Sequence, residues 1–179
     1  LKMFLYLAMI DSDANKSKFE ILYSEYKNLM YYTANRILRN SSDAEDVVHQ
    51  AFLKVIEILD TISSPRCHKT RALLVTITEH KAIDLYREKQ RRNVLPLAEE
   101  YIGAAPAAEI ERLAERDTLA AAIASLPPRY RSVLLLRYDC GYSNAEIANI
   151  LDTTEPNVRK LIQRAKEKLS ATLSGMEEP

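Results

Sequence analysis

Residues 142–169 read YSNAEIANILDTTEPNVRKLIQRAKEKL, a stretch that predicts two short helices separated by a tight turn. Ser143 and Glu146, three residues apart, form a capping box that starts the first helix. This helix is predicted to end near Asp152, because an aspartate tolerates the left-handed backbone of such a turn. Pro156 suits the first turn of the second helix. The arrangement is typical of a DNA-reading helix-turn-helix.

The second helix of this stretch has two different faces. Its apolar residues recur at helical spacing and are predicted to be buried; they are Val158, Leu161, Ile162, Ala165 and Leu169. The opposite face is polar and basic and would meet a DNA groove. We expect DNA contacts from Asn157, Arg159, Lys160, Gln163 and Arg164. An ordinary pair of helices with solvated charges is the alternative, and the agreement of cap, turn and buried positions favours DNA binding.

The composition indicates an all-α protein. The 179 residues include only three Gly, and long stretches follow helical spacing. Cys67 and Cys140 lie far apart without a CxxC partner, so a reduced, cytoplasmic chain is expected. The formal net charge is zero, yet basic residues cluster in 87–92 and 159–168. This distribution predicts weak DNA affinity for the chain alone.

The amino-terminal half is predicted to be helical as well. Capping boxes that begin at Ser17 and Ser42 predict two helices, ending near Leu38 and Leu59. A third helix is predicted over residues 69–92, with its apolar first half buried and its second half basic.

The two ends of this half carry different signals. Residues 1–10 are apolar but too few to span a bilayer, so we expect them to pack on the core without membrane insertion. Residues 93–109 mix proline and glycine with alanine and glutamate and have no helical period, which predicts a flexible linker. The chain is therefore interpreted as two small helical domains, residues 1–92 and 110–179, the second carrying the helix-turn-helix.

Three separated motifs point to a family. Residues 43–55 read DAEDVVHQAFLKV, residues 71–87 read RALLVTITEHKAIDLYR, and residues 126–138 read LPPRYRSVLLLRY ahead of the helix-turn-helix. In this order and spacing, over about residues 17–172, the chain resembles the extracytoplasmic-function (ECF) sigma factors of the sigma-70 superfamily.

The resemblance implies a sigma factor that is not an enzyme and needs no cofactor. Such a protein binds core RNA polymerase at the β′ clamp helices and the β flap, recognises the −10 and −35 promoter elements, and promotes transcription initiation. Residues 1–92 resemble sigma region 2, and residues 110–179 resemble region 4. The basic face of residues 157–164 would then read the −35 element.

A stripe along the first motif is the expected core-polymerase surface. Residues spaced three and four apart form a continuous row that suits a basic partner helix; with the acidic residue that opens the motif they are Asp43, Asp46, His49, Gln50 and Leu53. Helix capping alone is the alternative for Asp43. His49 stands where the family usually has Gln.

The expected −10 contacts come from the second motif and the loop before it. The loop over residues 63–70 is similar in position to the family's base-capturing loop. The full set is Arg66, His68, Lys69, His80, Lys81, Arg87, Arg91 and Arg92. The chain departs from the family at Leu73, usually Trp, and at His80, usually Asn.

Other functions are less well supported. A helix-turn-helix regulator that does not bind core polymerase is the main alternative, and a helical protein adaptor is a second. The histidines and Cys67 lack zinc-ligand spacing, and no catalytic motif is present. The sequence leaves open the promoter, the regulon, the inducing signal, the oligomeric state and any anti-sigma factor.

Overall fold

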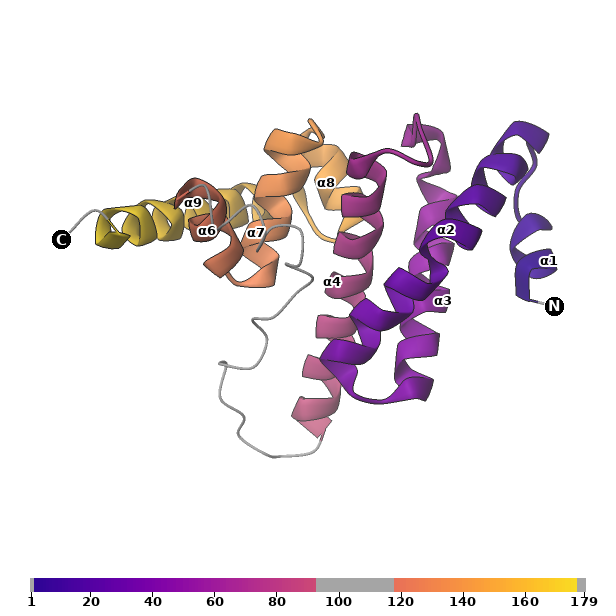
Figure 1. Cartoon of the computed structure of the whole chain (residues 1–179), viewed down its shortest axis with the longest axis horizontal. Coiled ribbons are helices and arrows are strands. Elements are labelled where there is room, and N and C mark those ends of the chain that lie inside the picture. The colour runs from indigo at the N-terminus through magenta and orange to yellow at the C-terminus, as the bar shows by residue number, and fades with distance from the viewer. Residues whose placement is uncertain (1, 93–117, 177–179) are drawn as a thin grey trace. The chain divides into compact units, whose positions relative to one another are not determined.

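A computed structural model of the chain describes residues 2–92 and 118–176 (Figure 1). The regular elements in these two ranges are all helical. The chain divides into two compact units, Leu1–Leu95 and Pro96–Pro179. The all-α prediction is thus confirmed for the described ranges, whereas the predicted linker over 93–109 lies outside them.

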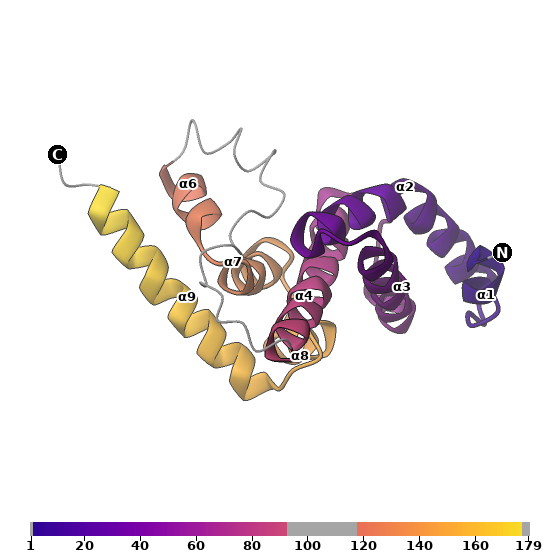
Figure 2. The same cartoon turned by 90° about the horizontal axis from the view of Figure 1, so that it is seen from below.

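The first unit is a bundle of long helices. Its elements are α1 (Lys2–Leu7), α2 (Asp13–Leu38), α3 (Ser41–Glu57), the 3-10 turn η1 (Leu59–Thr61) and α4 (His68–Arg92). Helices α2, α3 and α4 pack against one another in all three pairings (Figures 1 and 2). Large side chains that are fully buried include Phe19, Leu22, Met30, Phe52 and Leu74. As predicted, the first half of α4 is buried and its last turns are exposed.

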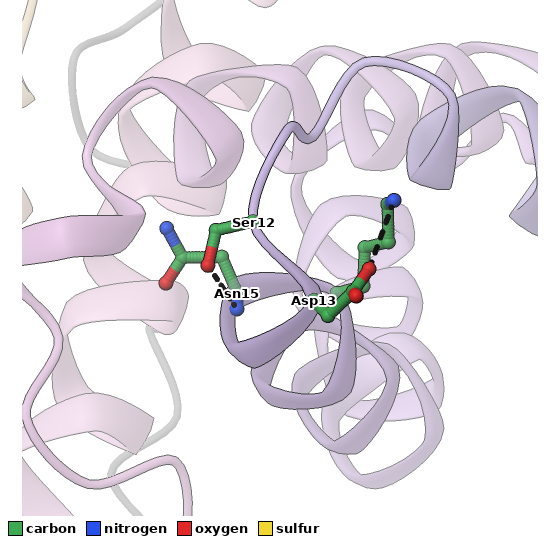
Figure 3. A network of polar contacts seen from close by, with 4 residues as sticks. Ser12, Asp13 and Asn15 are labelled. Carbon is green, nitrogen blue, oxygen red and sulfur yellow. Dashed lines mark hydrogen bonds and ion pairs between the residues drawn. The ribbon is translucent and has the colours of Figure 1, made fainter.

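Two helix starts differ from the sequence prediction. Helix α2 begins one turn before Ser17, because Ser12 caps it: the Asn15 backbone N–H donates to Ser12 Oγ at 3.5 Å (Figure 3). Helix α3 is capped by Asn40, whose Oδ1 accepts from the Asp43 N–H at 3.0 Å. The capping boxes predicted at Ser17 and Ser42 are therefore wrong, since an earlier polar side chain already satisfies the first N–H groups.

The second unit contains the helix-turn-helix. Its described elements are α6 (Thr118–Ser125), α7 (Pro128–Leu134), the π-helical segment η3 (Leu135–Asp139), α8 (Asn144–Ile150) and α9 (Glu155–Met176). Helix α9 packs against α6, α7 and α8. The break predicted at residues 126–128 is confirmed, because α6 ends at Ser125 and α7 begins at Pro128.

The helix-turn-helix has the predicted cap at the start of α8 and the predicted turn after it. Ser143 Oγ accepts from the Glu146 N–H at 3.2 Å, and the Glu146 carboxylate accepts from the Ser143 N–H at 2.7 Å. Asp152 has a left-handed φ of 49°. On the predicted inward face of α9, Val158 and Ala165 are fully buried, whereas Leu161, Ile162 and Leu169 are half-buried. Within the described ranges, no helix combines the length and apolarity needed to cross a membrane.

Candidate functional site

The stripe on α3 is an open surface over most of its length. Asp46 and Gln50 are exposed, and Leu53 is half-buried. Helix α3 begins at Ser41, so these residues occupy its second to fourth turns, on the side opposite its apolar contacts with α2 and α4. Within the described residues, neither the Asp46 carboxylate nor the Gln50 amide has a hydrogen-bond or ionic partner. The stripe can therefore present a carboxylate and an amide to a basic partner.

Asp43 is placed differently from the rest of the stripe. Its Oδ2 lies 2.5 Å from Nζ of Lys89, and its side chain is only 17% exposed. Lys89 belongs to the basic end of α4, so this ion pair ties the start of α3 to the end of α4. Asp43 thus has an intramolecular role that the sequence did not reveal.

His49 is held by a residue from α1. The Tyr6 hydroxyl and His49 Nδ1 lie 2.6 Å apart, and Tyr6 is 2% exposed. Burial, with a smaller contribution from Tyr23, raises the pKa of Tyr6 to about 12. The prediction that residues 1–10 pack on the core is borne out at Tyr6 and Ile10, which are both buried. Nothing in the local sequence singled out Tyr6 as a neighbour of the stripe.

A hydrogen-bonded loop precedes α4. The Arg66 guanidinium donates from Nε to Glu25 Oε1 at 3.1 Å, and the Thr70 hydroxyl donates to the Ser64 carbonyl at 2.6 Å. The Cys67 sulfur lies 3.3 Å from Thr70 Oγ1, and this contact lowers the pKa of the thiol below its ordinary value. These contacts give the loop a defined shape, with Arg66 at the surface.

The basic face of α4 contains most of its predicted members. His68 and Lys69 are exposed in the first turn, and Arg87, Arg91 and Arg92 are exposed in the last turns. Arg92 pairs with a carboxylate one turn earlier on the same helix. Lys81 is half-buried between these two groups of residues.

His80 lies on the same side of α4 as Arg87 and Arg91, seven and eleven residues before them, but it is covered. Its side chain is 7% exposed, so the expectation that it is exposed beside these arginines is wrong. The reason is its place along the helix, because Leu73 and Ile77 precede it in the same row and are each 1% exposed, in the part of α4 whose side chains are mostly buried.

The outward face of α9 has two kinds of side chain. The Asn157 amide donates to Thr153 Oγ1 at 2.8 Å, and Arg159 forms an ion pair with Glu155, one turn earlier. These two residues are oriented by contacts near the start of the helix.

In the next turns of α9, the cationic side chains are exposed and unpaired among the described residues. The Gln163 amide donates to Glu167 Oε1 at 3.1 Å. Lys160 and Arg164 are exposed and have no polar partner among the residues that the structure describes. They are therefore the two side chains of the predicted set that are ready to meet an anionic ligand.

Two lysines of the same basic cluster have a packing role. Lys166 Nζ lies 5.2 Å from the centre of the Tyr138 ring, and Lys168 Nζ lies 5.9 Å from that of Tyr130. These cation–π contacts hold α9 against the segments before α8. The basic cluster thus separates into an outward part and a packing part.

The comparisons with known families agree with this geometry. Residues 22–92 match the family model of sigma-70 region 2, and residues 116–169 match that of sigma-70 region 4. The chain belongs to the sigma-70 family. The first match covers α2 to α4, and the second covers the helix-turn-helix.

Curated relatives place this sigma factor in the ECF group. The ECF RNA polymerase sigma factor SigL of Mycobacterium tuberculosis is 28% identical over 154 residues, which is 85% of this chain and 86% of the relative. SigW of Bacillus subtilis, also an ECF sigma factor, is 28% identical over 160 residues, 83% of this chain and 84% of the relative. A solved structure of CnrH with the cytosolic domain of CnrY covers 97% of this chain and 96% of that chain at 25% identity and a TM-score of 0.41.

Proposed function

We propose that this sigma factor binds core RNA polymerase through the exposed stripe of α3. The observation that carries the proposal is the row of Asp46, Gln50 and Leu53, which is exposed or half-buried and continues beside His49. A buried apolar core accounts for the opposite side of α3, whereas Asp46 and Gln50 make no contact with the described residues that would assign them a structural role. The proposed partner is the pair of β′ clamp helices, with the β flap as partner of the second unit.

The two units are proposed to read different promoter elements. For the −10 element, the proposed contacts lie in the loop before α4 and on the exposed basic face of that helix; they are Arg66, His68, Lys69, Lys81, Arg87, Arg91 and Arg92. For the −35 element, the proposed contacts lie on α9; they are Asn157, Arg159, Lys160, Gln163 and Arg164. Cations supply phosphate affinity, whereas amides and arginines also read base edges.

The proposed domain limits are residues 1–92 and 110–179, with a linker between them. The protein would act in the cytoplasm, where it meets polymerase and promoter DNA, and no chemical step is assigned to it. An anti-sigma factor is a further proposed partner. The alternative function, a helix-turn-helix regulator, predicts no affinity for core polymerase.

The test is the affinity of the purified chain for core polymerase. Asp46→Arg replaces an attractive charge with a repulsive one and should weaken binding at least tenfold, or about 1.4 kcal/mol. Glu20→Arg, which makes the same charge change at an exposed position of α2, is the matched control and should bind normally. Equal affinities for the Asp46→Arg variant and wild type would remove the stripe from the interface, and a wild-type chain without affinity would favour the regulator.

A further inference from the structure

The side chain of Tyr6 connects α1 to the α3 stripe. Its ring lies among three aromatic rings of α2 and α3, with centroids 5.4 Å from Phe19, 5.8 Å from Tyr23 and 5.9 Å from Phe52. Its hydroxyl reaches His49 Nδ1 at 2.6 Å. The ring of His49 is also in contact, at 5.4 Å between centroids. Tyr6 is therefore fixed in position by packing on several sides.

The direction of this hydrogen bond follows from burial. The Tyr6 hydroxyl has no other hydrogen-bond partner among the described residues. If His49 Nδ1–H donated, the phenolic O–H of Tyr6 would be left in the aromatic cluster without an acceptor, which is unfavourable. Burial therefore favours Tyr6 as the donor to Nδ1. A neutral imidazole that accepts at Nδ1 has its hydrogen on Nε2.

We propose that Tyr6 is a positioning residue for polymerase binding, which holds His49 in the Nε2–H tautomer so that the stripe presents an N–H donor. This inference rests on the proposed role of the α3 stripe. The group recognised on the polymerase is then a hydrogen-bond acceptor, a carbonyl or carboxylate oxygen. A Gln at this position could offer either a donor or an acceptor, whereas the Tyr6–His49 pair offers only the donor.

The position of the pair allows a partner to reach it. Tyr6 and His49 both line a surface cavity of about 330 Å³ between α1, α2 and α3, together with Tyr23, Val48 and Phe52. The His49 ring forms no second hydrogen bond within residues 2–92 and 118–176. No described residue therefore competes with a partner for Nε2 of His49.

The first experiment removes only the hydroxyl. Tyr6→Phe retains the aromatic packing and should lower the affinity for core polymerase roughly twofold to tenfold, the range expected for one hydrogen bond. Tyr26→Phe removes the hydroxyl of another buried tyrosine, on α2 and outside this cavity, and is the matched control. Nitrogen-15 NMR of His49 should show the hydrogen on Nε2 in wild type and a mixture of tautomers in Tyr6→Phe. A hydrogen on Nδ1 in wild type would overturn the proposal.

A second experiment separates positioning from packing. In a His49→Gln background, the residue at position 49 has no tautomer for Tyr6 to select, so adding Tyr6→Phe should leave the core affinity unchanged. An equal loss from Tyr6→Phe in both backgrounds would show that Tyr6 acts only through packing and would overturn the inference. The Asp46→Arg result reports independently on the stripe: if that variant binds weakly while Tyr6→Phe binds normally, the proposed function stands and this inference fails.

Discussion

The two units of this sigma factor differ in how many of their predicted binding residues also make contacts within the fold. In the second unit, α9 buries one apolar row and leaves Lys160 and Arg164 open on the other side. In the first unit, the predicted site residues share contacts with the fold, as Asp43 does with Lys89 and His49 does with Tyr6. A long helix with a single buried face can change its outward residues freely, whereas a bundle that packs three long helices together cannot. Substitutions of Asp43 and His49 should therefore affect stability and binding together, whereas those of Lys160 and Arg164 should affect binding alone.

The largest expected effect concerns the core of the first unit. Phe52 is 0% exposed and contacts three aromatic rings, so Phe52→Ala should destabilise this unit by about 3–5 kcal/mol. Phe4→Ala, at a side chain that is 78% exposed, is the control and should change the free energy of unfolding by less than about 0.5 kcal/mol. Urea unfolding followed by circular dichroism measures both. Similar values for the two variants would contradict the described aromatic core.

The second unit should respond to a change on α9 in binding and not in stability. Arg164→Ala should reduce discrimination at particular −35 positions by about 1–3 kcal/mol, because an arginine can bind a base edge with two hydrogen bonds. Lys160→Ala should weaken binding to all sequences and reduce the salt dependence by about one phosphate contact. Selection from a randomised −35 library with the polymerase complex distinguishes them. Identical sequence preferences for wild type and Arg164→Ala would mean that this arginine reads no base.

The sequence predicted the second unit better than the first because its signals are local. The capping box at Ser143, the left-handed Asp152 and the buried row of α9 depend on residues within a few positions of one another. Helical periodicity also predicted the all-α fold and the buried first half of α4. Each of these patterns can be recognised within one stretch of sequence, without knowledge of tertiary contacts.

Apart from the two misplaced helix caps, which have a local cause, the predictions that failed or were incomplete depend on neighbours distant in sequence. Tyr6 and His49 are 43 residues apart, and Asp43 and Lys89 are 46 apart, so no local pattern reveals either contact. His80 was expected to be exposed because it shares a helix face with Arg87 and Arg91, yet it lies in the buried part of α4, which packs against two other helices. Tertiary packing decided the environment in each case.

Substitutions at helix caps should have smaller effects on the unfolding free energy, and they can be compared between the two units. Asn40→Ala should cost about 0.5–2 kcal/mol because Asn40 accepts the Asp43 N–H, and Ser143→Ala should cost a similar amount in the second unit. Ser42→Ala is the control within α3 and should be close to neutral, since Ser42 lies in the first turn of the helix and does not cap it. Unfolding free energies of the three variants decide between the capping residue that the sequence predicted and the one in the structure. A greater cost for Ser42→Ala than for Asn40→Ala would reverse that assignment.

The smallest expected effect is the pH dependence of the cap on α8. Hydrogen bonds from Ser143 lower the pKa of Glu146 below its ordinary value of 4.5. A lowered pKa in the folded state means that the carboxylate contributes stability above the unfolded value, and that this contribution is lost as the pH falls through the folded value. Because Glu146 is exposed, solvent screening keeps the effect below that of losing the cap itself.

Glu146→Gln isolates this contribution, since the amide oxygen can still accept from Ser143 N–H but does not titrate in this range. The stability advantage of wild type over Glu146→Gln should be constant near neutral pH and should shrink as the pH falls below about 4.5, because wild type then loses the contribution of the ionised carboxylate. Parallel pH profiles for wild type and Glu146→Gln would mean that the reciprocal hydrogen bonds do not favour the ionised carboxylate. In that case the capping box of the second unit would contribute no pH-dependent stability.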